Sequence, residues 1–288
     1  MRNHSPLISS SSFYSNDDSN EVSYTKTTFS GDNHPSLLSF TTFTSCIFDT
    51  LTSSSNGGAV SFLSGKMLTV VDCLFSGCTT SIRYSYSNGG GAICIESGTF
   101  SIISSVFISC TTLSYGGGIF VHDGSQSSTV TFCTFIDCKA DHGGGLTTYY
   151  GPSSTVLSNI FLSCSAYSFG GGVFHDGLKS HFISLSNSLF ADNKANSDND
   201  RNRGGGGFED YRDSAYTSTY SFCFFSRNTA VRGVGYDVCA HDNKLDIHNI
   251  IHCFTITNPE VAFWNNGTYQ SNEDADWFLI LMYHNPYE

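Results

Sequence analysis

The side chains best suited to bind a cation or a carboxylate lie in one polar stretch, residues 192–213, which reads DNKANSDNDRNRGGGGFEDYRD. Carboxylate oxygens are the ligands that Ca²⁺ prefers, and an arginine side chain pairs with a carboxylate through two parallel hydrogen bonds. The stretch does not have the twelve-residue spacing of an EF-hand loop. We interpret it as a solvated loop, with a calcium or carbohydrate site as the alternative. The calcium candidates are Asp192, Asp198, Asp200, Glu209, Asp210 and Asp213, and the uronate-pairing candidates are Arg201, Arg203 and Arg212.

A histidine stands next to an aspartate at four places, residues 122–123, 141–142, 175–176 and 241–242. A base beside a carboxylate is a common arrangement for general acid–base catalysis. However, neighbours along a strand point to opposite faces, and Asp-Gly is a frequent turn sequence. We therefore expect turns at these places and assign no catalytic residue.

Eleven cysteines raise the question of disulfides or zinc. Free cysteine packs as a small buried hydrophobe, and we expect most of these thiols to be buried and unpaired. Disulfides Cys78–Cys110 and Cys138–Cys164 are the alternative, although in-register parallel strands hold the Cβ vectors alongside each other, which is poor geometry for a bridge. The C-x4-C pairs at 73/78 and 133/138 have a zinc-like spacing, but they fall too far apart to share one tetrahedral ion.

Most of these cysteines belong to a repeat. The closing motif Phe-x-x-Cys or Phe-x-x-Asn recurs in steps of 27, 32, 28, 26, 29 and 35 residues, and glycine clusters recur in phase with it. No helical periodicity runs through any unit, and short apolar runs separated by Gly, Ser, Asn and Asp are typical of strands and turns. The phenylalanines of the motif are Phe48, Phe75, Phe107, Phe135, Phe161, Phe190 and Phe225.

A unit of this length, with two or three short strands, must stack on its neighbours to bury an inner face. We predict an all-β right-handed parallel β-helix of about seven to eight coils, with like side chains aligned along its axis about 4.8 Å apart. We place Ala59 and Ala92 in one column with Ile119, directly after the glycines. The predicted ladder residues are Phe75, Phe107, Phe135 and Phe161, then Cys73, Cys133, Asn159 and Cys223, and finally Cys78, Cys110, Cys138, Cys164, Asn193 and Asn228.

The expected organisation has three parts. Residues 1–40 form an N-terminal cap or first partial coil, residues 41–255 form the repeats, and residues 256–288 form a C-terminal cap or the start of a continuation. The segment LDIHNIIHC is predicted to be a degenerate eighth coil, with Leu245, Ile250 and Cys253 at the spacing of the columns.

Composition narrows the possible partners. The formal net charge of −12 disfavours nucleic acid, because a polyanion would be repelled. The N-terminal residues show no recognisable secretory signal, and the longest apolar run, residues 277–283, is too short for a spanning helix. We expect no membrane insertion by this chain, and the oligomeric state and the compartment are left open.

The glycine runs followed by an apolar pair (GGAV, GGGAI, GGGIF, GGGVF), alternating with Phe-x-x-Cys or Phe-x-x-Asn, resemble the GGA[ILV] and FxxN repeats of polymorphic outer-membrane proteins. The pattern also resembles the wider pectin-lyase-like superfamily of right-handed β-helices. The resemblance covers residues 40–255, and cysteine replaces asparagine in four closing motifs. It implies a surface or extracellular protein that binds host or extracellular glycans or proteins.

The expected function is therefore a non-catalytic repeat module for adhesion or ligand display, without a cofactor unless calcium binds. The alternative is a polysaccharide lyase or hydrolase on the same scaffold, because a fold alone does not assign function. Acids of residues 192–213 gathered beside Asp72 or Asp137, with Arg83 nearby, would favour the enzyme.

Overall fold

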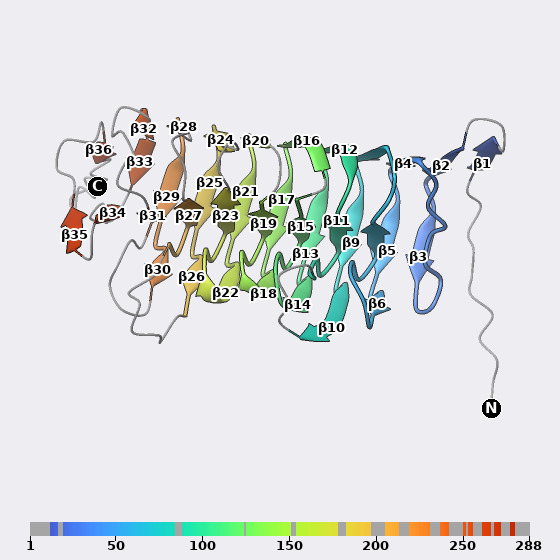
Figure 1. Ribbon diagram of the computed structural model, residues 1–288, viewed down its shortest axis with the longest axis horizontal. Coiled ribbons are helices and arrows are strands. Elements are labelled where there is room, and N and C mark those ends of the chain that lie inside the picture. The colour runs from blue at the N-terminus through green and yellow to red at the C-terminus, as the bar shows by residue number, and fades with distance from the viewer. Residues whose placement is uncertain are drawn as a thin grey trace, which may run out of the picture.

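The computed structural model describes residues 12–16, 20–83, 88–123, 125–150, 154–177, 183–196, 205–212, 219–230, 237–241, 250–251, 253–255, 261–265, 268–271 and 277–279. Strands make up the regular structure in these ranges, and successive coils follow one another along the long axis of the molecule (Figure 1). Within this part of the chain, no helix has the length and apolar character needed to cross a membrane.

The strands form four sheets, which we name A to D in the order in which the chain visits them. Sheet A contains β1 (Ser12–Asn16), β2 (Glu21–Thr25), β4 (Phe40–Thr44), β8 (Met67–Val71), β12 (Gly98–Ile103), β16 (Ser125–Thr131), β20 (Ser154–Leu157), β24 (Ile183–Ser186), β28 (Thr219–Ser221) and β32 (Ile250–Ile251). Sheet B contains β3 (Thr28–Ser30), β5 (Ile47–Asp49), β9 (Leu74–Ser76), β13 (Val106–Ile108), β17 (Thr134–Ile136), β21 (Ile160–Leu162), β25 (Leu189–Ala191), β29 (Phe224–Ser226), β33 (Cys253–Thr255) and β36 (Trp277–Leu279).

Sheets C and D complete each coil. Sheet C contains β6 (Thr52–Ser53), β10 (Thr79–Arg83), β14 (Thr111–Leu113), β18 (Lys139–His142), β22 (Ser165–Phe169), β26 (Lys194–Ala195) and β30 (Thr229–Ala230). Sheet D contains β7 (Val60–Phe62), β11 (Ile93–Ile95), β15 (Ile119–Val121), β19 (Leu146–Tyr149), β23 (Val173–Gly177), β27 (Phe208–Arg212), β31 (Val238–His241), β34 (Val261–Asn265) and β35 (Thr268–Ser271).

The chain passes through sheets A, B, C and D in turn, and each strand then pairs in parallel with the strand one coil earlier. From β4 to β31 the described residues form seven coils with a strand in every sheet. The predicted parallel β-helix is therefore confirmed, but each coil has four strands rather than two or three. The eighth coil begins at β32, where Ile250 pairs with Tyr220.

The two ends depart from this parallel pattern. Strand β1 pairs antiparallel with β2 at one end, and β35 pairs antiparallel with β34 at the other. Strands β2 and β3 already stack in parallel register on β4 and β5. The division into residues 1–40, 41–255 and 256–288 stays a prediction.

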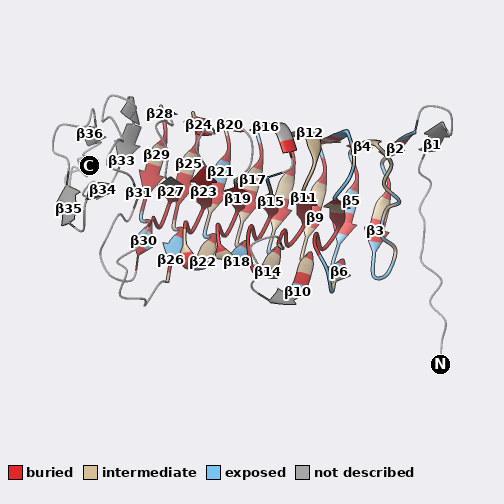
Figure 2. Cartoon of the chain, viewed as in Figure 1, coloured by how far each residue is buried: buried red, intermediate tan, exposed pale blue. Residues whose placement is uncertain are grey.

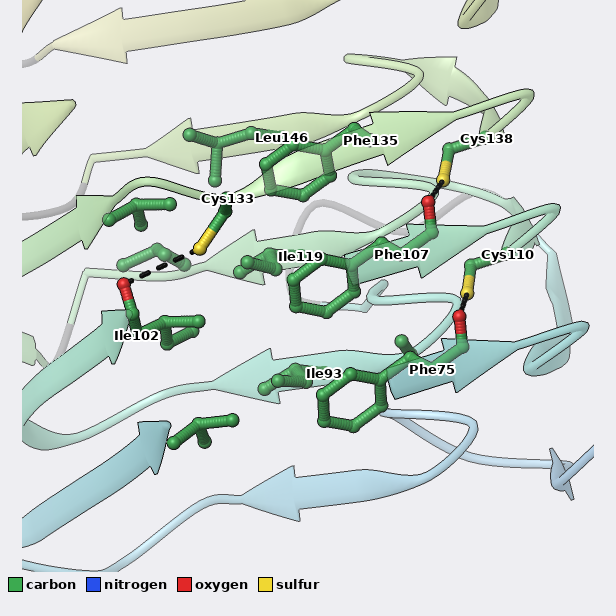
Figure 3. Close-up of a cluster of buried hydrophobic side chains, with 14 of the residues drawn as sticks. Phe75, Ile93, Ile102, Phe107, Cys110, Ile119, Cys133, Phe135, Cys138 and Leu146 are labelled. Carbon is green, nitrogen blue, oxygen red and sulfur yellow. Dashed lines mark hydrogen bonds between the residues drawn. The ribbon is translucent and has the colours of Figure 1, made fainter. Parts of the chain in front are cut away.

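The inside of the coil is a column of stacked phenylalanine rings contributed by sheet B (Figure 3). Neighbouring rings from Phe75 through Phe107 and Phe135 to Phe161 have centroids 4.7–4.8 Å apart and lie within 6° of parallel. The column continues to Phe29 at one end and Phe225 at the other. Each stacked pair stabilises the fold by about 0.5–1.5 kcal/mol beyond the area it buries. Buried residues accordingly recur along the strands of the described coils (Figure 2).

Two corners of each coil turn on one residue in the left-handed conformation. The corner between sheets A and B uses the residue three before the phenylalanine, and the corner between sheets B and C uses the residue two after it. In one coil these are Ser104, with φ of 50°, and Ser109, with φ of 51°. The buried cysteine and asparagine columns stand directly after these corner residues.

The three glycines of each run have separate roles, which residues 143–145 illustrate. Gly143 has φ of 62°, a conformation that side chains disfavour. A Cβ atom on Gly144 would lie 2.3 Å from the carbonyl oxygen of Gly171 in the next coil, and one on Gly145 would lie 2.7 Å from the Phe161 ring. The run therefore lets the backbone approach both the next coil and the ring column.

The predicted alignment is wrong by one residue in the first two glycine runs. Ile119 pairs with Ile93, which in turn pairs with Val60, so Ala59 and Ala92 occupy the third glycine position instead. The shift arises because the first glycine of the run 89–91 pairs with Tyr115, the residue directly before the run 116–118. The run 89–91 therefore begins one position earlier in the coil than the run 116–118.

The close approach at Gly144 can be tested with Gly144→Ala. We expect the free energy of unfolding to fall by about 3 kcal/mol or more, because backbone atoms of two neighbouring coils would have to move. Gly31→Ala is the control, since nothing lies within 4 Å of the Cβ position of Gly31, although its φ is left-handed and that of Gly144 is not. It should cost only about 1–2 kcal/mol in urea unfolding. Equal losses for the two variants would contradict the close coil contact.

Candidate functional site

The acidic stretch of residues 192–213 is only partly described. Asp192 lies at the corner between sheets B and C, where both of its oxygens accept hydrogen bonds from Arg227, at 2.7 and 2.6 Å. The hydrogen bonds from Arg227 lower the pKa of Asp192. Asp198, Asp200 and Asp213 lie outside the described residues, as do the side chains of Glu209 and Asp210 in β27. The calcium site stays a prediction.

The other acids named for the enzyme hypothesis do not meet. Asp137 lies in the same corner column as Asp192 but two coils earlier, and its carboxylate is 3.1 Å from Lys139. Asp72 lies at the other corner, between sheets A and B. Arg83 ends β10, and its side chain lies outside the described set. Within the described residues, no group of three His, Cys, Asp or Glu side chains is arranged to hold a metal ion.

The turn prediction is wrong for two of the four His-Asp pairs, because residues 141–142 end strand β18 and residues 175–176 lie within β23. The Nδ1 atom of His142 is 3.0 Å from the Asp141 carboxylate, but its ring is buried between Tyr115 and Phe169, with centroids 4.7 and 4.8 Å away. His175 is fully buried, and its Nδ1 atom is 2.6 Å from the hydroxyl of Thr148. Both histidines are thus part of the packing.

His142 contacts a second apolar cluster that the repeat pattern did not reveal. It contains Cys94, Tyr115, Phe120, Tyr149 and Phe174, with Tyr150 and Phe169 partly buried beside it. Strand alternation explains its position: Ile119 and Val121 face the coil interior, so Phe120 between them faces outward. The cluster packs on the outer side of sheet D.

The cysteine columns are corner hydrogen-bond donors. At the corner between sheets B and C the thiols donate to carbonyl oxygens of the previous coil, as Cys110 does to Phe75 at 3.6 Å and Cys138 to Phe107 at 3.5 Å (Figure 3). Asn193 makes the equivalent bond to Phe161 through Nδ2 at 2.9 Å, and its Oδ1 accepts the backbone N–H of Cys164. Cysteine and asparagine are therefore interchangeable here because both satisfy the buried backbone at the bend.

The other corner follows the same rule. Cys133 donates to Ile102, and Asn159 donates to Val130 while accepting the backbone N–H of Cys133. The nine cysteines whose side chains are described are buried and form no disulfide. Burial raises the pKa of the Cys133 thiol to about 12, which keeps it protonated at neutral pH. The hydrogen bonds at the corners give the described cysteine columns a structural role.

The outer face of sheet A carries a continuous column of hydroxyl groups. These residues stand six positions before each phenylalanine, pair with one another through eight successive coils, and alternate with buried neighbours. The sequence alone could have revealed this column, because a Ser or Thr recurs at this position in each repeat. The column consists of Ser23, Thr42, Thr69, Ser101, Thr129, Thr155, Ser184 and Thr219.

The adjacent outer face of sheet B is mainly apolar. Its first outward column contains Ile47, Leu74, Val106, Thr134, Ile160, Leu189 and Phe224. The strands β4 to β28 of sheet A and β9 to β29 of sheet B contain no charged residue. In a chain with a net charge of −12, these two faces are therefore locally neutral.

Two hollows lie near the N-terminal end of the coils. One is lined by residues that include Leu37, Phe62 and Leu63, and the other by residues that include His34, Asn56 and Ala59. Neither hollow is lined by an Asp, Glu or Arg side chain.

Comparison with known proteins identifies the fold. A family model described as "Right handed beta helix region" matches residues 80–219, just under half of the chain. The match agrees with the right-handed crossover expected of parallel strands in one sheet, so the coil is a right-handed parallel β-helix. No curated protein and no solved structure matches the chain significantly.

The equivalence of cysteine and asparagine can be tested at position 164. Cys164→Asn should change the free energy of unfolding by less than about 1 kcal/mol, because the amide can donate to Phe135 as the thiol does. Cys164→Ala should lower it by about 1–3 kcal/mol, because the buried carbonyl then lacks this donor. Urea unfolding under reducing conditions measures both variants. An asparagine variant as unstable as the alanine variant would contradict the assigned role.

Proposed function

We propose that this chain is a non-catalytic β-helix module of a surface or secreted protein and serves adhesion or ligand display. The observation that carries the proposal is the uninterrupted hydroxyl column on sheet A, next to the apolar face of sheet B. A long regular surface without charge offers a ligand many weak and equivalent contacts, whereas an enzyme needs a few reactive groups gathered at one place.

The acids support the same proposal. Asp192 is engaged by Arg227 and Asp137 by Lys139, on different coils, and Asp72 lies at another corner. A lyase or hydrolase requires carboxylates or an arginine directed at one sugar. The resemblance to the repeats of polymorphic outer-membrane proteins adds support from the residues of the glycine and Phe-x-x-Cys motifs.

The proposal can be tested with the whole chain in two assays. In the first, the protein is added to cultured cells and to surfaces coated with extracellular matrix, and saturable binding is expected. In the second, it is incubated with pectate and alginate with and without Ca²⁺, and no unsaturated uronides are expected. Release of uronides, or no binding to any cell or matrix surface, would contradict the proposed function.

A further inference from the structure

The corner between sheets A and B contains two phenylalanines, whereas five other coils have a small polar residue there and the first has Lys26. Phe132 and Phe222 have φ of 56° and 53°. The left-handed conformation is unfavourable for a bulky side chain and suits Asn, Asp or glycine. The equivalent residues in the neighbouring coils are Ser45, Asp72, Ser104, Ser158 and Asn187.

Neither phenylalanine gains enough burial to explain its presence. The side chains of Phe132 and Phe222 are 60% and 52% exposed. A left-handed backbone and an exposed aromatic ring each carry a cost. Such a position is expected where the ring itself meets a ligand.

The rings border the hydroxyl face. Phe132 follows Thr131 at the end of β16, and in the next coil its neighbours along the corner are Leu157 and Ser158. Phe222 follows Ser221, one coil beyond Ser186 and Asn187. Three strand spacings separate the two phenylalanines, which is about 14 Å along the axis.

We infer that the row of corner residues from Phe132 to Phe222, together with the hydroxyl column of sheet A, binds an extended neutral polysaccharide. This inference rests on the proposed function and specifies its ligand. The apolar face of a sugar ring packs on an aromatic ring, and the sugar hydroxyls exchange hydrogen bonds with serine and threonine, which both donate and accept. A polymer with a regular repeat can use a column of equivalent hydroxyls.

Charge favours a neutral polysaccharide over an acidic one. An acidic polysaccharide such as a uronan would find no cation on these strands and would be repelled by the net charge of −12. The strands of sheet B are three residues long, so its seven-coil face measures about 10 Å by about 30 Å, or roughly 300 Å². The longer strands of sheet A give roughly 500 Å². The two adjacent faces together offer roughly 800 Å², which is about the area that one partner buries in a stable protein interface. The polysaccharide is therefore favoured by the hydroxyl column and the exposed rings rather than by area.

The test uses the whole chain and a double variant, Phe132→Ser with Phe222→Asn, which restores the residue types of the neighbouring coils. Binding is measured on immobilised mannan, mixed-linkage β-glucan, xyloglucan and galactan, with polygalacturonate as the acidic comparison. The thermal midpoint of each protein is measured in parallel. The control is Tyr167→Ser, which removes an aromatic ring that is 59% exposed on sheet C.

We expect the wild type to bind at least one neutral polysaccharide and not polygalacturonate. The double variant should lose at least tenfold in affinity while its thermal midpoint stays equal or rises, because the strain is removed. The control should bind as the wild type does. A lower thermal midpoint in the double variant would assign the rings a structural role and overturn the inference.

The outcomes separate this inference from the proposed function. If the wild type binds cells but none of the four neutral polysaccharides, adhesion stands and the glycan inference fails. If that cell binding is also lost in the double variant, the corner binds a protein instead, which equally overturns the polysaccharide assignment. Equal polysaccharide binding by the wild type and the double variant places the site elsewhere.

Discussion

The stacking of one coil on the next in strict register is the constraint on which the rest of this structure depends. Parallel pairing sets a spacing of about 4.8 Å, and aromatic rings that stack face to face with an offset occupy nearly the same spacing. The rings of Phe107 and Phe135 accordingly have centroids 4.8 Å apart. The backbone ladder and the ring column therefore stabilise the same register.

The corner residues, the buried hydrogen-bond donors and the glycine runs all serve to keep successive coils in register where the chain bends. A bend interrupts the ladder, so a left-handed residue turns the chain and a buried donor on the next residue satisfies the carbonyl oxygen of the coil before it. Cys138 and Asn193 perform this task with different chemistry. Glycines such as Gly144 let two backbones approach where any side chain would separate them. Cysteine fits at these corners because it is small and its thiol donates a hydrogen bond. This explains why the chain has many cysteines although the described ones form no disulfide and no metal site.

Much of the interior could be predicted from the sequence, because inward residues repeat with the coil. Phe75 and Cys78 stand at fixed distances from one another and align without knowledge of the fold. The shift at Ala92 could not be predicted, because only backbone pairing shows that Gly89 takes the place of Tyr115. The buried positions of His142 and His175 were missed since Asp-His and His-Asp next to glycine look like turn sequences.

The outer surface was harder to interpret for a physical reason. A solvent-facing position accepts many residue types, so a column there is noticed only when its members share one chemistry. The serine and threonine column met that condition and was still overlooked beside the stronger phenylalanine signal. Phe132 and Phe222 stand out only once their exposure and backbone conformation are known.

A double-mutant cycle on the ring column tests the in-register stacking most directly. Phe107→Ala and Phe135→Ala remove neighbouring rings, while Phe107→Ala and Phe161→Ala remove rings separated by one intervening ring. Urea unfolding should give a coupling energy of about 0.5–1.5 kcal/mol for the neighbouring pair. The separated pair should be additive within about 0.5 kcal/mol. Equal coupling in the two cycles would contradict the stacked coils.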